Sequence, residues 1–240
     1  MKGLFFQKPL EFHIQVEGES WSQGQTIKGK LTIKNHAPES QIAGPLGVHL
    51  AVGDLKKVKN KTPGGLKISK SFDVHPTQSE VSWEFPTDLN CQVTDSRFSY
   101  FLVYGVGADP DQMGALELKF KPIPLVLEFV ESFKTHQRFV QKSIKFSKGQ
   151  VDIKLIPPDS KAFSKLESVT ISFSSTSEEL QVEYDFALKK VEATAMNLEV
   201  TKVSKTLEQT LAIRDCYTAA GRLAHETLEG AIAEALASIV

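Results

Sequence analysis

Hydrophobic and polar residues alternate along about the first 200 positions of the chain, with the period of two that a half-buried β-strand shows. Residues 10–16 alternate Leu, Phe, Ile and Val with Glu, His and Gln. Residues 27–33 repeat the pattern with lysine on the polar side, and residues 46–52 supply a third run. Turns rich in Gly, Ser and Pro separate these runs, so the sequence predicts a mostly β protein with antiparallel strands.

Further strands are predicted at 66–75, 79–85, 97–106 and 115–121. The run 97–106 is dense in aromatic and β-branched residues, which is typical of a strand buried on both faces. Many short strands at this spacing favour a β-sandwich over alternating strand–helix units.

The segment Lys121-Pro122-Ile123-Pro124 marks a domain boundary, because two prolines exclude a central strand there. Residues 1–121 are predicted to form one β-sandwich and residues 122–206 a second one, with strands near 151–155, 169–173 and 180–188. Residues 125–133 have apolar positions at roughly helical spacing, and a short helix and a strand both stay open for them.

From Leu207 onward Ala becomes frequent and apolar residues recur at steps of three and four. This spacing predicts a C-terminal amphipathic helix of about seven turns within residues 207–240. The helix either docks on its own sandwich or binds in trans, through self-association or a partner's groove. Its candidate contact residues are Tyr217, Leu228, Ile232 and Leu236.

Charge and cysteine content narrow the class of protein. The net charge of -1 lacks the basic excess of a nucleic-acid binder. Cys91 and Cys216 are the two cysteines and form neither a disulfide framework nor a metal-binding spacing, which favours a reducing, cytoplasmic setting. The apolar run at residues 4–6 is too short for a signal peptide, and no apolar run is long enough for a transmembrane helix.

Motifs of catalysis are missing from the sequence. The six histidines show no paired metal-ligand spacing, and neither a nucleophile elbow nor a phosphate-binding loop is present. We therefore predict no catalytic, cofactor-binding or metal-binding residue, and a protein that is not an enzyme.

One loop carries a concentration of positive charge. Lys56, Lys57, Lys59 and Lys61 follow one another closely with Asp54 nearby. They could contact an acidic or phosphorylated partner or a membrane surface. The competing interpretation, which we favour, is a solvated hairpin tip.

The first half resembles the arrestin clan, which includes arrestins, the arrestin-fold subunit of retromer and bacterial sporulation-control proteins. The resemblance is carried by the strand 10–16, the turn with Gly24, the run Ile-Lys-Gly-Lys-Leu-Thr-Ile at 27–33, and the segments 81–86 and 96–103. It covers residues 4–121. The Pro-Gly-Glu that often precedes the glycine-containing strand is absent here, and a long C-terminal helix is not a general feature of the clan.

This resemblance implies two arrestin-like sandwiches in an intracellular, non-catalytic adaptor or scaffold that binds other proteins and has no cofactor. The partner is recognised by sheet edges, loops or the terminal helix. An alternative is a β-sandwich module that binds a small ligand or carbohydrate through exposed aromatics. Trp21 is the freer candidate for that role, because Trp83 alternates in register with core positions. An enzyme whose site is assembled from distant residues is the third hypothesis.

Overall fold

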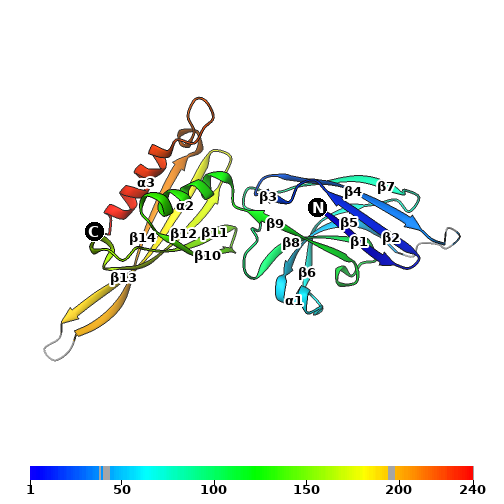
Figure 1. Cartoon of the computed structure of the whole chain (residues 1–240), viewed down its shortest axis with the longest axis horizontal. Helices are drawn as coiled ribbons and strands as arrows, with labels where there is room; N and C mark the ends of the chain where they lie inside the picture. The colour runs from blue at the N-terminus through cyan, green and yellow to red at the C-terminus, as the bar shows by residue number, and fades with distance from the viewer. Residues whose placement is uncertain (38, 40–43, 194–197, 240) are drawn as a thin grey trace. The chain divides into compact units, whose positions relative to one another are not determined.

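The computed structural model describes residues 1–37, 39, 44–193 and 198–239. Residues 190–193 and 198–200 are described by their backbone alone. The chain divides into two compact units, Met1–Lys121 and Pro122–Val240 (Figure 1). Antiparallel sheets dominate both units and a helix lies near the C-terminus, which confirms the predicted mostly β fold.

The first unit contains two sheets that share one core. One sheet has the strand order β1-β2-β4-β7 and the other β3-β9-β8-β5-β6. Side chains from both sheets, including Phe12 and Leu31 on one and Leu102 and Tyr104 on the other, form a single buried cluster. The strands are β1 (Lys2–Gln7), β2 (Leu10–Val16), β3 (Ser20–Ser22), β4 (Thr26–Asn35), β5 (Leu46–Asp54), β6 (Leu66–Asp73), β7 (Glu80–Pro86), β8 (Phe98–Val106) and β9 (Gly114–Lys121).

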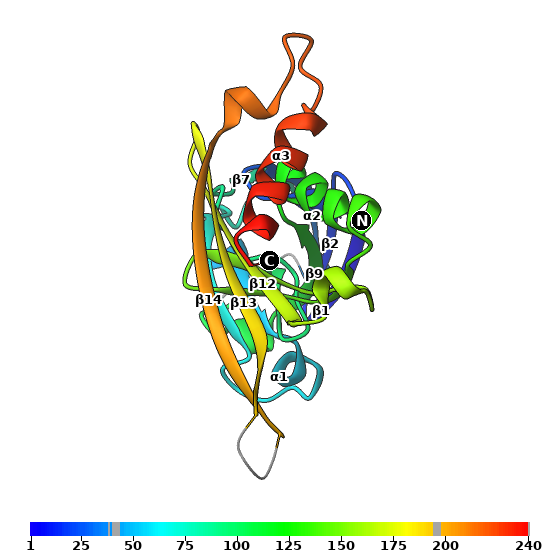
Figure 2. The ribbon, with the colours of Figure 1, turned by 90° about the vertical axis from the view of Figure 1, so that its left-hand side faces the viewer.

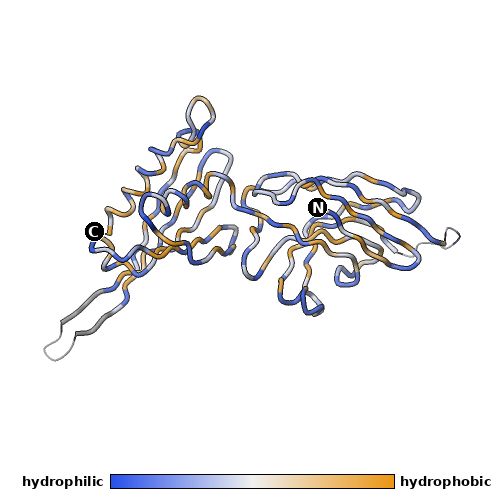
Figure 3. Tube along the Cα trace, viewed as in Figure 1, coloured by the Kyte–Doolittle hydropathy of each residue, from blue (hydrophilic) through white to orange (hydrophobic). Residues whose placement is uncertain are grey.

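Alternation explains why these segments become strands with one buried face. In β2 and β4 every second side chain is buried, and Figure 3 shows hydrophobic and hydrophilic segments following one another along the strands. Strand β8 is buried at seven consecutive positions, as its aromatic and β-branched content predicts. The connection 55–65 between β5 and β6 contains one short helix, α1 (Leu55–Lys59), and a single-turn helix, η1 (Pro110–Gln112), precedes β9.

The second unit is one five-stranded antiparallel sheet whose strands follow the chain, β10-β11-β12-β13-β14. Helices α2 and α3 lie next to each other on one face of this sheet (Figure 2). Phe129 of α2 packs edge-on against Phe173 of β12, with ring centroids 5.5 Å apart. The elements are α2 (Pro124–His136), β10 (Val140–Ser147), β11 (Gln150–Ile156), η2 (Lys161–Phe163), β12 (Leu166–Ser175), β13 (Glu179–Ala193), β14 (Leu198–Ala212), η3 (Ile213–Cys216) and α3 (His225–Ala237).

Residues 122–206 therefore differ from the sandwich expected for them. Among the described residues, helices and not a second sheet cover the apolar face of β10–β14. Alternation within a strand shows that one face is buried, but it does not show what covers that face. The segment 125–133, for which helix and strand stayed open, belongs to α2, which begins at Pro124, where proline suits the first turn.

The C-terminal helix is shorter than the predicted one. Strand β14 continues to Ala212, so residues 207–212 are strand and the expectation of a helix from Leu207 is wrong. The chain then turns through η3 and a short loop in which Gly221 has φ of 72°, a left-handed conformation that ends any regular helix. Within the described residues 207–239, the α-helix is limited to His225–Ala237.

Candidate functional site

The edge strand β1 presents two large apolar side chains to solvent. Leu4 and Phe6 are 54% and 60% exposed, although both belong to a regular strand. They lie opposite His13 and Glu11 of β2 in the antiparallel register, on the sheet face that points away from the core. A solvated strand face usually carries polar side chains, so this pair needs a reason.

The backbone of β1 is unpaired at the same residues. The N–H of Val16 donates to the Met1 carbonyl at 2.9 Å, and the Met1 amino group donates to the Val16 carbonyl at 2.7 Å. Hydrogen-bonded pairs alternate along an antiparallel ladder, so Gly3, Phe5 and Gln7 also direct their backbone groups toward β2. The N–H and C=O groups of Leu4 and Phe6 therefore point to the free edge, where the described sheet has no further strand.

Polar groups beside the edge are held in fixed positions. Glu11 accepts from His36 Nε2 at 2.9 Å and from Lys34 Nζ at 3.3 Å, and it also contacts His13 Nε2. At the end of β1, the Gln7 amide bonds both the carbonyl and the N–H of Val106. The Gln7 contact anchors the end of β1 without using its outer edge.

Electrostatics around Glu11 favour its carboxylate form. Hydrogen bonds from His36 first, then from His13 and Lys34, lower the pKa of Glu11 to about 2. A carboxylate surrounded by three nitrogen donors has most of its lone pairs occupied. Glu11 therefore supports the surface beside Leu4 and Phe6 and is not a free acid or base.

The predicted lysine loop surrounds helix α1 and is solvent-exposed. Asp54 caps this helix by accepting from the N–H groups of Lys56 at 3.1 Å and Lys57 at 3.2 Å. Arg97 Nε lies 3.4 Å from Asp54 on its other side. Lys56, Lys57, Lys59 and Lys61 are all exposed. The loop is therefore an ordered, exposed segment with four lysines, and its role in binding stays a prediction.

The predicted contact residues of the C-terminal helix face their own sheet. Leu228, Ile232 and Leu236 are 0%, 1% and 6% exposed. The docked arrangement, one of the two alternatives for this helix, is the one that the structure shows. Tyr217 lies outside α3, half-buried, in a bridge with Leu223. These three helix residues cannot contact a partner unless α3 leaves the sheet.

The aromatic residues considered for a ligand site are in the core. Trp21 is 5% exposed, so the expectation that it is free is wrong, and Trp83 is 3% exposed as its register predicts. Trp21 stacks on Phe120, with ring centroids 6.1 Å apart. Neither indole offers a surface for a carbohydrate ring.

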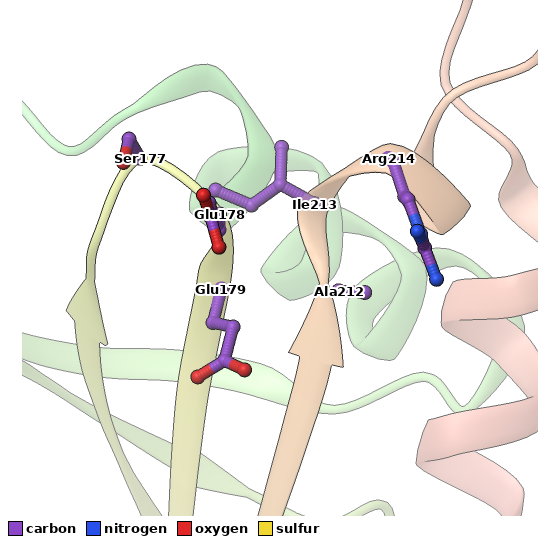
Figure 4. Close-up of a pocket in the computed structure, with 6 residues that line it drawn as sticks. All are labelled: Ser177, Glu178, Glu179, Ala212, Ile213 and Arg214. Carbon is purple, nitrogen blue, oxygen red and sulfur yellow. The ribbon is translucent and has the colours of Figure 1, made fainter.

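An open pocket at one end of the five-stranded sheet of the second unit is lined by several charged residues (Figure 4). The carboxylate of Glu179 points along the strand, whereas Arg214 lies on the far side of β14. The ion-pair partner of Arg214 is Asp215, whose Oδ1 lies 3.4 Å from Arg214 Nε, and neither glutamate of the pocket. A catalytic site requires charged groups that converge on one point, and these groups do not converge. The lining residues are Ser177, Glu178, Glu179, Ala212, Ile213 and Arg214.

The described residues contain no group of three or more His, Cys, Asp or Glu side chains arranged to hold a metal ion. None of their helices has the length and apolarity needed to cross a membrane.

Sequence reasoning missed the β1 edge. Leu4, Phe5 and Phe6 are consecutive apolar residues and do not alternate, so they did not indicate a strand. A usable signal was present, because Gln7-Lys8-Pro9 is a turn-like segment directly before the strand 10–16, which is the pattern of a hairpin.

Comparison with solved structures places the fold. Spo0M, a sporulation control protein from Bacillus subtilis, matches with a TM-score of 0.60 at 12% identity, over 98% of this chain and 100% of that one. An alpha-2-macroglobulin of Salmonella matches at a TM-score of only 0.33, with 11% identity, over 84% of this chain and 14% of that one. No protein-family model and no curated protein matches the sequence. The fold of this chain is therefore arrestin-like, as the residues of its first half predict.

Proposed function

We propose that this chain is a non-catalytic, intracellular adaptor of arrestin-like type that binds an extended segment of another protein along the free edge of β1. The observation that carries the proposal is the coincidence, at Leu4 and Phe6, of exposed apolar side chains with unpaired backbone groups. Addition of a strand uses both, because main-chain hydrogen bonds supply affinity and alternate side chains supply specificity.

The surroundings of the edge support this role. The Gln7 amide ties the end of β1 to the backbone of Val106, and Glu11 of the neighbouring strand β2 is held by His36 and Lys34. Binding to a strand that is already ordered costs less conformational entropy than binding to a flexible segment. An arrestin-like fold is consistent with an adaptor, and the buried positions of Trp21 and Trp83 make the carbohydrate-binding alternative weaker.

The proposal is tested by co-purifying partners with the wild-type chain and with a Leu4→Glu/Phe6→Lys variant, in which neither new charge lies opposite a like charge of β2. Both substitutions lie on an exposed strand face, so we expect the fold to persist and the specific partner to be lost. The matched control is Val140→Glu on β10, because Val140 is 65% exposed and apolar but belongs to the other unit. A partner that the double variant keeps at full affinity would contradict the role of β1.

A further inference from the structure

Strand β14 is the longest edge strand of the described sheets. The six edge strands are β1, β3, β6, β7, β10 and β14. Strand β14 has 15 residues, whereas the others have between three and eight. Natural sheets protect their edges with short strands, bulges or proline. The pairing of β10 has a bulge and β7 ends at Pro86, but β14 has an unbroken register and no proline.

Every second residue of β14 directs its backbone groups away from the sheet. The N–H of Ile213 donates to the Glu178 carbonyl at 2.7 Å. Along an antiparallel ladder this bond sets the odd-numbered residues of β14 toward β13 and the even-numbered ones toward the free edge. The outward-pointing residues with described side chains include Lys202, Ser204, Thr206 and Glu208.

The order of side chains along this edge is self-complementary. A two-fold axis at Lys205 places Lys202 opposite Glu208 of a second copy, and the reverse pair forms on the other side of the axis. The same axis places Val203, which is 44% exposed, opposite Leu207 of the second copy. Opposite charges and apolar residues that face one another across strands each stabilise the pairing.

Pairing with a second copy would relieve a repulsion that Glu208 has within its own chain. Within the chain it lies directly opposite Glu183 on the open face of the sheet. Like charges directly opposite one another are unfavourable, and no ion pair within the described residues neutralises either glutamate. The ammonium group of Lys202 from a second copy supplies the missing positive charge, which it shares with Glu167 of its own chain, 2.7 Å away.

Lys205 lies on the two-fold axis, where it faces Lys205 of the second copy. This pair of like charges is unfavourable. Its ammonium group donates to the carbonyl of Ser238 at the C-terminal end of α3. Carbonyl groups at a helix C-terminus carry partial negative charge and stabilise a cation. The charge of Lys205 is therefore held toward the helix of its own chain and away from the axis.

We propose that two copies of this chain associate through their β14 edges, antiparallel and centred on Lys205, so that their five-stranded sheets become continuous. This dimer does not use β1, so it is independent of the adaptor role.

Charge reversal tests the pairing, with the mass of the full chain followed by light scattering over a concentration series. Glu208→Lys and Lys202→Glu each place like charges opposite one another twice, so each should raise the dimer Kd by about tenfold or more. The double variant Lys202→Glu/Glu208→Lys should restore the dimer. A wild-type chain that stays monomeric at every concentration overturns the proposal, as does a dimer that neither single variant weakens.

Folding is checked in the same variants by thermal unfolding. Glu208→Lys replaces the unfavourable pair with Glu183 by a favourable one, so its melting temperature at low concentration should not fall. Weakened dimerisation of Glu208→Lys with an unchanged melting temperature therefore supports the proposal. Lys202→Glu also breaks the ion pair with Glu167 of its own chain, so a lower melting temperature is expected for it alone.

Cysteine cross-linking tests the register. In Lys205→Cys the two new thiols face one another, with Cα atoms about 4.5–5.5 Å apart, which suits a disulfide. Ser204→Cys is the matched control, because its thiol faces Thr206 of the second copy and lies too far from its own counterpart. The native cysteines are buried. Mild oxidation should link the Lys205→Cys dimer only, and the opposite result overturns the register.

Discussion

The two units of this chain bury the same kind of strand in different ways. In Met1–Lys121 a second sheet supplies the other half of the core. In Pro122–Val240 two helices from the beginning and the end of the unit, α2 and α3, cover the single sheet. Alternation in a strand therefore specifies a buried face, and the covering layer depends on segments far away in the sequence.

The difference also changes the edges available for binding. The two sheets of the first unit have four edges, and the single sheet of the second has two. In the first unit the proposed binding edge is the apolar, six-residue β1, and in the second it is the charged, 15-residue β14. We assign the first to another protein and the second to another copy of this chain.

The largest expected effect comes from the aromatic contact between helix and sheet. Phe129 is fully buried and packs on Phe133 and Phe173. Phe129→Ala should destabilise the second unit by about 3–5 kcal/mol. Hydrogen exchange should show faster exchange in β11–β13 and unchanged protection in β2 and β4. Equal loss of protection in both units would break the comparison between them.

The next effect tests whether α3 belongs to the core. Ile232 is 1% exposed, and Ile232→Ala should lower the free energy of unfolding of the second unit by about 2–5 kcal/mol. The neighbouring Ala233 is exposed, so Ala233→Ser is a matched control with little effect. Chemical denaturation measures both variants. If Ile232→Ala leaves stability unchanged, α3 does not dock on the sheet in solution.

A smaller effect comes from the polar link between the sheet and α3. The buried Tyr184 hydroxyl donates to Gln209 Oε1 at 2.8 Å, and Gln209 Nε2 donates to the Ala231 carbonyl at 3.2 Å. Tyr184→Phe should cost about 0.5–1.5 kcal/mol and speed amide exchange in α3. Tyr104→Phe, the same change at a buried site of the first unit, should leave α3 exchange unaltered.

The smallest effect is specific to the first unit and depends on pH. The pKa of Glu11 is lowered from 4.5 to about 2, so its carboxylate stabilises the folded state above pH 4.5. That contribution is lost as the pH falls through about 2. The difference in melting temperature between the wild type and Glu11→Gln should be present at pH 5 and shrink toward pH 2. A difference that grows over this range would contradict the hydrogen bonding described for Glu11.

Most strands of the first unit were predictable from local patterns, such as the alternation in 10–16 and 27–33, whereas β1 was not, because Leu4, Phe5 and Phe6 do not alternate. The helix boundary near residue 207 was not, since Leu207 and Leu211 fit both a strand face and a helical step. The left-handed Gly221 that separates strand from helix carried no local signal strong enough to place the break.

The candidate site was less predictable than the fold. Whether Leu4 and Phe6 lie at an edge depends on the strand order, which contacts distant in sequence decide. The lysines and the helix residues were chosen for local composition. Burial of Leu228 and Ile232 shows that an apolar helical face indicates packing before it indicates a partner.

Amide hydrogen exchange along β1, with and without a bound partner, tests the central claim most directly. In the free chain we predict slow exchange at Gly3, Phe5 and Gln7 and fast exchange at Leu4 and Phe6, because only the latter point to the free edge. On binding, Leu4 and Phe6 should become protected. Protection of all five amides in the free chain, or a bound partner that leaves Leu4 and Phe6 exchanging fast, would contradict the account.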